Sequence, residues 1–286
     1  MQSYAQLGTA GLSALLALCG LAHPAHAAER VQFESARYQV GPLQRRLALE
    51  RREPIIPAAP SIIDGFLTKP DGPGPFPGIV HLHGCGGLPD DVKRGANHFW
   101  SERLVSWGYA VVVVDSFTAR GINNSCSVEA VPRVADAIGA LAWLAQQSFI
   151  DANRIAVMGF SAGAIATLSV AEARDFELFE NEAEHKFRAA IAFYPACMSD
   201  NPMKMPTLIL IGELDDWTPA RACRATAARR TGGSPVKLVI YPDTYHSFDS
   251  PRSGRRYFGH WLEYNKAAAE HATEEVRGFL TQHLSQ

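Results

Sequence analysis

The chain has 286 residues, of which 47% are hydrophobic and 20% are charged. This composition is typical of a globular protein and excludes a disordered chain, a collagen and a small disulfide-stapled scaffold. The chain has 27 basic and 29 acidic residues, so its formal net charge is −2. It therefore has no large positive field for sequence-independent binding of nucleic acid.

The first 27 residues have the features of an export signal. They contain no Lys, Arg, Asp or Glu, and their apolar stretch from Leu12 to Ala22 is too short to cross a bilayer. Ala25-His26-Ala27 then places small residues where a signal peptidase cuts. We predict a signal peptide over residues 1–27, a single domain over 28–286, no membrane span and a periplasmic or secreted protein. A cytoplasmic protein with an apolar N-terminal tail is the alternative.

The apolar pattern beyond the signal predicts an α/β protein. Residues 30–60 are irregular and are expected to supply one or two edge strands, and residues 61–69 are expected to form a strand. After the turn cluster Pro70 to Pro75, continuous apolar runs predict strands over 78–82, 109–114, 154–158, 189–193, 207–211 and 236–241. Segments with helical spacing or Ala-rich composition separate them, at 134–144, 162–173, 220–230 and 264–284. Such alternation indicates a doubly wound, mainly parallel sheet with helices on both faces.

One serine lies where a parallel sheet places its active sites. Gly159-Phe160-Ser161-Ala162-Gly163 follows the strand at 154–158 and precedes an Ala-rich helix. Gly-x-Ser-x-Gly between a strand and a helix is the pattern of a nucleophile elbow, in which a strained turn exposes the serine at the helix N-terminus. We predict that Ser161 is a nucleophile; an N-capping serine in a glycine-flanked turn is the alternative.

A carboxylate and a histidine follow the next strands in chain order. Asp215 and Asp216 come just after the strand at 207–211, and one of the two is expected to cap the following helix. His246 lies in the loop directly after the strand at 236–241. Ser, then Asp, then His is the order of a hydrolase triad on this kind of sheet, so the three positions support one another.

An early glycine-rich loop offers the fourth part of such a site. His83-Gly84-Cys85-Gly86-Gly87 follows the strand at 78–82 and suits an oxyanion hole made of backbone N–H groups. We assign its donors to Cys85 and to Ala162, which follows the serine. A zinc site on His81 and His83 would need a third ligand that the sequence does not offer, and the loop does not have the pattern of a phosphate-binding loop. No metal or cofactor is expected.

The chain resembles the dienelactone hydrolase family of α/β hydrolases over about residues 60 to 250. The matching pieces are His83 to Gly87, Asp115-Ser116-Phe117 with Arg120-Gly121, the segment around Ser161, Phe193-Tyr194-Pro195, Gly212-x-x-Asp215-x-x-x-Pro219 and His246-Ser247-Phe248. The resemblance implies an α/β-hydrolase fold and assigns the acid to Asp215. Members that open dienelactones use a Cys nucleophile and a Glu in the early loop, whereas this chain has Ser161 and Gly84 there. The basic residue that the family carries shortly after the histidine is also displaced, because position 250 is Ser.

These observations predict a serine hydrolase that cleaves a small-molecule carboxylic ester or lactone through an acyl-enzyme. A peptidase of the same fold and a non-catalytic binding protein on this scaffold are the alternatives. Arg120 is expected at the mouth of the site as a ligand for a substrate carboxylate, with a solvated surface arginine as the alternative. Trp217 is a second candidate for contact with the substrate.

Four cysteines remain after removal of the signal: Cys85, Cys126, Cys197 and Cys223. They form no Cys-x-x-Cys motif, and they allow three pairings or four free thiols. Cys197 and Cys223 follow strands that are expected to be neighbours, and so do Cys85 and Cys126. We therefore predict the disulfides Cys197–Cys223 and Cys85–Cys126.

Overall fold

The structure is a computed structural model, and it describes residues 27–37, 40–54, 60–93, 95, 98–127, 131–172, 185–251 and 254–285. The predicted signal peptide therefore lies, but for Ala27, outside the described residues. Within them, no helix is both long and apolar enough to cross a membrane.

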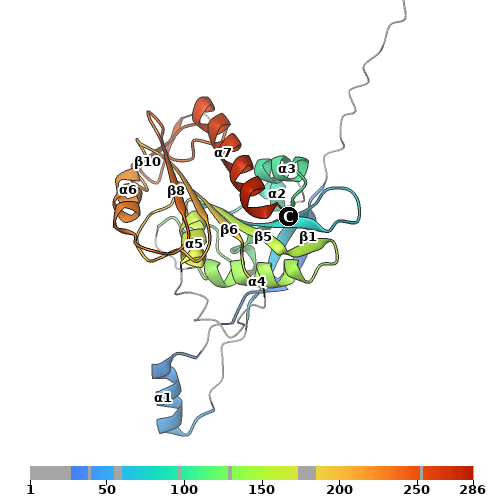
Figure 1. Ribbon diagram of the computed structural model, residues 1–286. Coiled ribbons are helices and arrows are strands. Elements are labelled where there is room, and N and C mark those ends of the chain that lie inside the picture. The colour runs from blue at the N-terminus through green and yellow to red at the C-terminus, as the bar shows by residue number, and fades with distance from the viewer. Residues whose placement is uncertain are drawn as a thin grey trace, which may run out of the picture.

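An eight-stranded sheet forms the centre of the protein (Figure 1). In spatial order its strands are β1 (Glu29–Glu34), β2 (Ile62–Thr68), β4 (Ala110–Asp115), β3 (Phe76–Leu82), β5 (Ile150–Phe160), β6 (Ala189–Phe193), β7 (Thr207–Gly212) and β8 (Val236–Tyr241). The pairs β1–β2 and β2–β4 are antiparallel, and every pair from β4 to β8 is parallel. Every residue of β4, β6 and β7 is buried, which explains why these strands read as continuous apolar runs.

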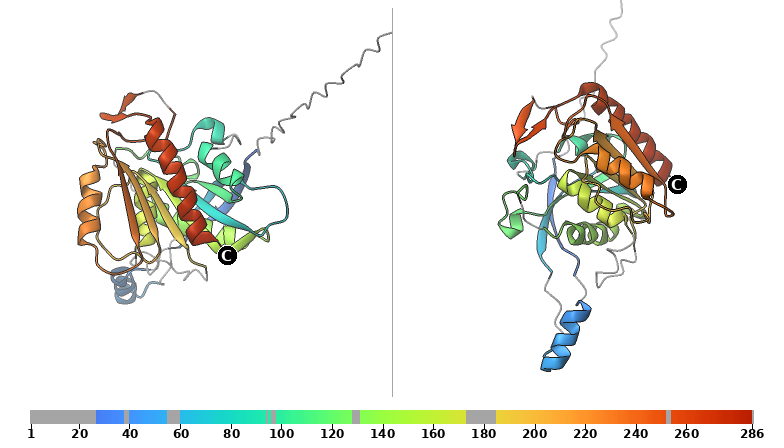
Figure 2. Two further views of the ribbon diagram at one scale, coloured as in Figure 1. Left: turned by 45° about the horizontal axis from the view of Figure 1, so that its top comes forward. Right: turned by 90° about the vertical axis from the view of Figure 1, so that its left-hand side faces the viewer.

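Helices cover both faces of the sheet. Figures 1 and 2 show α3 (Phe99–Ser106) and α7 (Lys266–Leu284) on one face and α4 (Arg133–Ala145) and α5 (Ala162–Ala171) on the other. The helix α6 (Ala220–Arg229) packs on β8. Together with the sheet order, this confirms the predicted α/β-hydrolase fold with a mainly parallel, doubly wound sheet.

Some elements differ from the sequence-based expectation. Residues 30–60 supply one edge strand, β1, but also the helix α1 (Pro42–Arg51), which stands away from the sheet in Figures 1 and 2. Small elements that were not predicted are α2 (Asp90–Lys93), the turn η1 (Thr118–Arg120) and the hairpin of β9 (Arg255–Tyr257) and β10 (His260–Leu262). They are too short for their periodicity to be read from sequence.

Both predicted disulfides are confirmed. Cys85 is bonded to Cys126 and Cys197 to Cys223, with Cα atoms 4.9 and 4.8 Å apart. The argument from strand order holds as well, because β6 pairs with β7 and β3 pairs with β4. Cys85–Cys126 links two loops that follow β3 and β4, and Cys197–Cys223 links the loop after β6 to the helix α6 after β7.

Candidate active site

Ser161 occupies a sharp turn between β5 and α5. Its backbone has φ 52° and ψ −117°, a conformation that costs free energy for any residue with a side chain. Two glycines make the turn possible. A Cβ atom on Gly159 would lie 2.3 Å from the Gly163 carbonyl oxygen, and one on Gly163 would lie 2.3 Å from the Leu82 carbonyl oxygen. The predicted strand–turn–helix arrangement and the steric role of its glycines are thus confirmed.

A hydrogen-bonded chain connects Ser161 to His246 and Asp215. The Nε2 atom of His246 is 3.1 Å from the Ser161 Oγ, and its Nδ1 is 2.7 Å from the Asp215 Oδ2. His246 and Asp215 are buried, and Ser161 is half-buried. The three residues come from loops after β5, β7 and β8, which end at the same edge of the parallel sheet.

The Asp215 carboxylate is held by its own loop. The backbone N–H groups of Trp217 and Thr218 donate to Oδ1 at 3.0 and 2.8 Å, and the Thr218 hydroxyl donates to Oδ2 at 2.8 Å. Asp216 points elsewhere: its side chain is half-exposed and lies 3.3 Å from the His260 Nδ1. Neither aspartate caps α6 as expected, because the N-cap of this helix is Pro219 and no side chain bonds to its first turn.

Two backbone amides are available beside Ser161. Among the described residues, the N–H groups of Cys85 and Ala162 have no hydrogen-bond partner. A Cβ atom on Gly84 would lie only 3.7 Å from the Ser161 Cβ, so the glycine-rich loop passes directly by the serine. Ala162 is the first residue of α5, where the helix dipole favours negative charge.

Ser161 and His246 line a cavity of about 670 Å³. Among the described residues, Arg255 is the only Lys or Arg that lines it, and its Phe, Tyr and Trp side chains are Phe99, Phe160, Tyr194, Trp217 and Tyr257. This size is typical of a small-molecule site.

The sequence profile of the dienelactone hydrolase family matches residues 63–284. The chain belongs to the dienelactone hydrolase family. It is 26% identical over 236 residues to dipeptidyl peptidase 8 of Mus musculus, covering 70% of this chain and 26% of that protein. It is 28% identical over 224 residues to the cutinase cut1 of Thermobifida fusca, covering 73% of this chain and 62% of the cutinase. The chain therefore spans about a quarter of the peptidase and under two thirds of the cutinase.

A solved structure has the same fold. The thermophilic esterase Est2 of Thermogutta terrifontis, with propionate bound, superposes with a TM-score of 0.58 and 19% sequence identity. The match covers 78% of this chain and 91% of the esterase. At this identity the likeness concerns the fold alone.

In this member of the dienelactone hydrolase family, one of the two residues predicted to contact the substrate lines the cavity and the other does not. Trp217 lines the cavity, with its ring centroid 5.1 Å from that of His246 and 4.8 Å from that of His260. Arg120 does not line it. Its guanidinium binds both carboxylate oxygens of the buried Asp136 at 2.7 and 2.9 Å and the Ser116 carbonyl oxygen at 2.7 Å. The expectation that Arg120 sits at the mouth of the site is thus wrong, as is the alternative of a solvated surface residue.

Sequence reasoning missed a buried network behind His246. The Asp249 carboxylate accepts hydrogen bonds from the Tyr194 hydroxyl and the Trp100 Nε1, both at 2.8 Å. Burial raises the pKa of Asp249, although these hydrogen bonds and His246 act in the opposite direction. The Tyr194 ring lies 4.6 Å from the His246 ring, so the network supports one side of the imidazole. Of the three residues in this network, only Tyr194 lies in a family phrase, Phe193-Tyr194-Pro195, and that phrase assigns it no role.

The histidine in β3, His81, and the one just after it, His83, pack against different rings. His81 packs against His98 and Phe160, whereas His83 packs against Phe117. In the described part of the chain, no three His, Cys, Asp or Glu side chains are grouped so that they could hold a metal ion.

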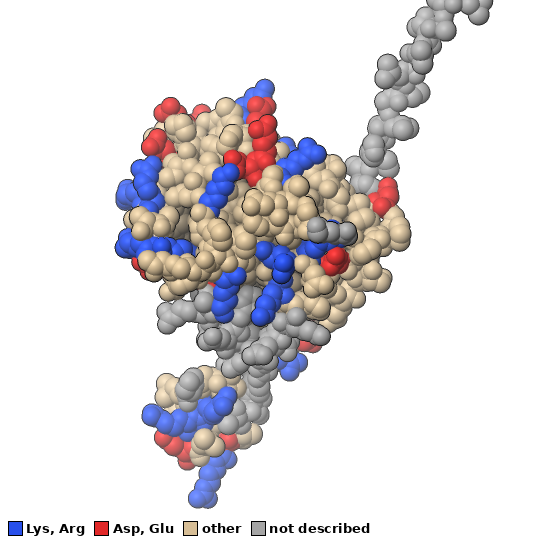
Figure 3. Space-filling view, in the orientation of Figure 1, with Lys and Arg blue, Asp and Glu red and all other residues tan. Residues whose placement is uncertain are grey.

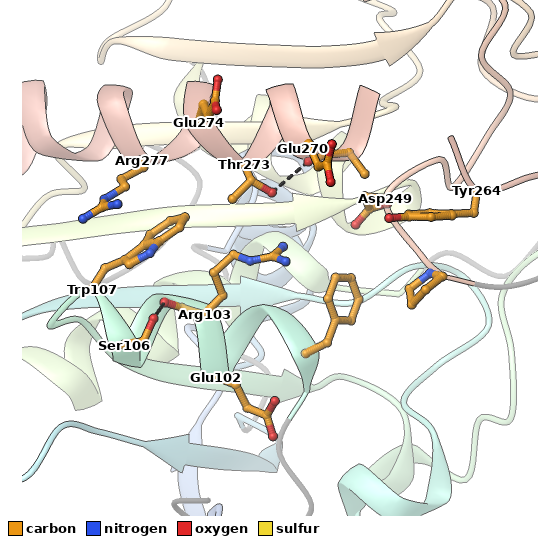
Figure 4. Close-up of a pocket in the computed structure, with 13 residues that line it drawn as sticks. Glu102, Arg103, Ser106, Trp107, Asp249, Tyr264, Glu270, Thr273, Glu274 and Arg277 are labelled. Carbon is orange, nitrogen blue, oxygen red and sulfur yellow. Dashed lines mark hydrogen bonds between the residues drawn. The ribbon is translucent and has the colours of Figure 1, made fainter. Parts of the chain in front are cut away.

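A second cavity, of about 680 Å³, lies between α3 and α7 (Figure 4). Arg103 of α3 and Trp107, just after this helix, face it from one side, and Glu270 and Arg277 of α7 face it from the other. Phe99, Asp249 and Pro251 line both cavities, so the two adjoin. Ser161 and His246 line only the first, which is therefore the candidate active site.

Proposed function

We propose that this protein is an exported serine hydrolase that cleaves a carboxylic ester or lactone through an acyl-enzyme. The observation that carries the proposal is the hydrogen-bonded chain Asp215–His246–Ser161, with the serine on a strained turn and two unpaired amides beside it. The family and the cutinase relative support ester chemistry.

In this mechanism, His246 Nε2 takes the Ser161 proton as Oγ attacks the acyl carbon. Asp215 accepts the hydrogen bond from Nδ1, which fixes the imidazole tautomer and stabilises the imidazolium. The N–H groups of Cys85 and Ala162 donate to the oxyanion of the tetrahedral intermediate, and each contributes roughly 3 kcal/mol to lowering the barrier. His246 returns the proton to the leaving alcohol. Water then hydrolyses the acyl-enzyme with His246 as the base.

A fluorophosphonate probe tests this proposal. We expect stoichiometric labelling of Ser161, found by peptide mapping, and loss of labelling in Ser161→Ala and His246→Ala. A protein that folds but neither reacts with the probe nor hydrolyses p-nitrophenyl esters would instead be a binding protein on this scaffold.

A serine peptidase is the second candidate, because dipeptidyl peptidase 8 is among the relatives. A panel of p-nitrophenyl esters of increasing acyl length, run beside aminoacyl p-nitroanilides, separates the two activities. We expect turnover of the esters and none of the anilides, and the reverse result would favour the peptidase.

Export is inferred from the first 27 residues and is compatible with the two disulfides, since disulfides persist in oxidising compartments. N-terminal sequencing of the protein recovered from the periplasm or the medium tests it. A mature chain beginning at Ala28 is the expected result, and a chain that stays in the cytoplasm with its N-terminus intact would contradict it.

A further inference from the structure

A buried arginine holds the glycine-rich loop from behind. Arg133, in the first turn of α4, is 6% exposed. Its Nη1 donates to the His83 carbonyl oxygen at 2.9 Å, and its Nη2 lies 3.3 Å from the Gly84 carbonyl oxygen and 3.4 Å from the Ser125 hydroxyl. The guanidinium also lies 4.7 Å from the centroid of the Phe117 ring.

The side chain of His83 reinforces this hold. Its Nδ1 is 2.7 Å from the Gly84 carbonyl oxygen, which can only accept, so Nδ1 carries the proton. Burial and the neighbouring charge of Arg133 lower the pKa of His83 to about 3, and the ring is therefore neutral at working pH. Arg133 Nη1 lies 3.4 Å from this Nδ1. Because both nitrogen atoms carry hydrogen, this contact is not a hydrogen bond.

These contacts fix the orientation of one peptide plane. The Gly84 carbonyl oxygen is approached by His83, Arg133 and the Gly87 N–H, the last at 3.2 Å. In a trans peptide the carbonyl and the following N–H point in opposite directions, so the Cys85 N–H points away from this group of donors. Donors on the carbonyl also polarise the peptide and strengthen its N–H as a donor.

Arg133 is not committed to an ion pair. None of the carboxylates in the described chain lies within ion-pair distance of it, and the nearby Asp136 is bonded to Arg120 and to the Ser35 hydroxyl. Burial lowers the pKa of Arg133 to about 10, which still leaves the side chain charged at neutral pH. The charge of this buried cation is thus directed at backbone carbonyls beside the serine.

We propose that Arg133 is a positioning residue for the oxyanion hole: with His83, it locks the Gly84–Cys85 peptide so that the Cys85 N–H faces the oxyanion formed at Ser161. This inference rests on the proposed function and goes beyond it, since it assigns an element of the transition-state machinery to a side chain that touches no substrate.

The test compares Arg133→Met, Arg133→Lys and the wild type. We expect Arg133→Met to lower kcat for a p-nitrophenyl ester roughly 10- to 100-fold, less than the loss of a whole donor, with KM changed by no more than about threefold. Arg133→Lys should recover part of kcat, because an ammonium can bind one of the two carbonyls.

A second readout separates positioning from a general loss of structure. A trifluoromethyl ketone forms a hemiketal oxyanion with the serine, and its inhibition constant should rise by the same factor as kcat/KM falls. Binding of an ether analogue of the substrate, which has no carbonyl oxygen to place against the Cys85 N–H, should stay unchanged.

Arg230→Met is the control, because the Arg230 side chain is only 7% exposed, pairs with Glu172, donates to the Ser199 carbonyl oxygen and does not line the active-site cavity. It should lower the melting temperature without lowering kcat. If Arg133→Met lowers the melting temperature but keeps the wild-type kcat and inhibitor affinity, the inference fails while the proposed function stands. If the wild type hydrolyses no ester and Ser161 is not labelled, the proposed function itself fails.

Discussion

The two neighbouring aspartates after β7 are chemically identical, and only their contacts distinguish them. The Oδ1 atom of Asp215 receives two backbone N–H groups, which leaves Oδ2 facing His246. In Asp215→Asn, the amide oxygen must stay with those N–H groups, so the NH2 group would face Nδ1 and favour the wrong tautomer. We expect kcat to fall about 10³- to 10⁴-fold.

Asp216→Asn is the matched variant for this prediction. Its carboxylate is half-exposed and contacts His260 and the Trp261 N–H, so kcat should change by less than about twofold. Steady-state kinetics on the same ester measure both. A larger loss in Asp216→Asn than in Asp215→Asn would show that the acid was wrongly assigned.

At the scale of single residues, the triad could be predicted from the sequence, but the residues that hold the triad and the glycine-rich loop in place could not. Ser161, Asp215 and His246 each follow an apolar run, so topology alone brings them together. Arg133 and Asp249 carry no comparable signal, because their roles depend on which carbonyl or ring lies opposite them in space. Arg120 shows the converse error: its position after β4 was read correctly, but the chain turns it towards α4 and away from the cavity.

At the scale of elements, Arg120 joins η1 to α4. Its partner Asp136 is fully buried and also accepts a hydrogen bond from the Ser35 hydroxyl next to β1, at 2.7 Å. Arg120→Ala would leave this carboxylate without a cation, and we expect a loss of about 3 kcal/mol in the free energy of unfolding.

Kinetics distinguish this role from substrate binding. In Arg120→Ala, KM for acidic and for neutral esters should change by the same factor, because the guanidinium does not reach the cavity. The double variant Arg120→Met/Asp136→Leu, which removes both charges, should recover part of the stability. A rise in KM confined to acidic esters would restore Arg120 as a ligand for the substrate.

The two disulfides hold segments with different roles. Cys85 belongs to the loop beside Ser161, and the Ser125 N–H next to its partner Cys126 donates to the Cys85 carbonyl oxygen at 2.8 Å. Cys197 and Cys223 are 26 residues apart and do not line the active-site cavity. Chain entropy predicts that removing either bond costs roughly 3 to 4 kcal/mol of unfolding free energy.

We expect the two disulfides to differ in their effect on kcat. Cys85→Ala/Cys126→Ala should also lower kcat, by at least about tenfold, because a loosened loop misplaces the Cys85 N–H. Cys197→Ala/Cys223→Ala should keep kcat near the wild-type value. The comparison is made below the melting temperature of both variants. Equal kcat values in the two would show that the bond at Cys85 acts on stability alone.

At the scale of the whole molecule, the described residues include five buried aspartates and one buried arginine, and the surface carries charges of both signs (Figure 3). On the face seen in Figure 3, Lys and Arg are interspersed with Asp and Glu, and some of the basic residues gather over α6. This mixture agrees with the net charge of −2. Between about pH 7.5 and about pH 5, the acid sensitivity of the fold should depend on groups that are buried in the neutral form and whose ordinary pKa lies in that range.

Two of these groups are histidines at the end of β3. Burial, with smaller effects of His98 and His83, lowers the pKa of His81 well below its ordinary value of 6.5. Burial and Arg133 lower the pKa of His83 to about 3. In the unfolded chain both rings take up a proton near pH 6.5. Their contribution to stability is therefore complete above pH 6.5 and is lost progressively as the pH falls below it, for His83 down to about pH 3.

We expect the free energy of unfolding, measured by urea titration between about pH 7.5 and about pH 5, to fall below pH 6.5 by about 1.4 kcal/mol per pH unit for each of the two histidines. The raised pKa of Asp249 opposes this loss at the acidic end, since the folded state binds that proton more tightly than the unfolded chain does. His81→Phe keeps a ring against Phe160 and should reduce the slope of unfolding free energy against pH by the contribution of one histidine. His271→Gln, at a half-exposed position on α7, is the control and should leave the slope unchanged. A slope in His81→Phe equal to that of the wild type would show that His81 does not resist protonation in the folded state.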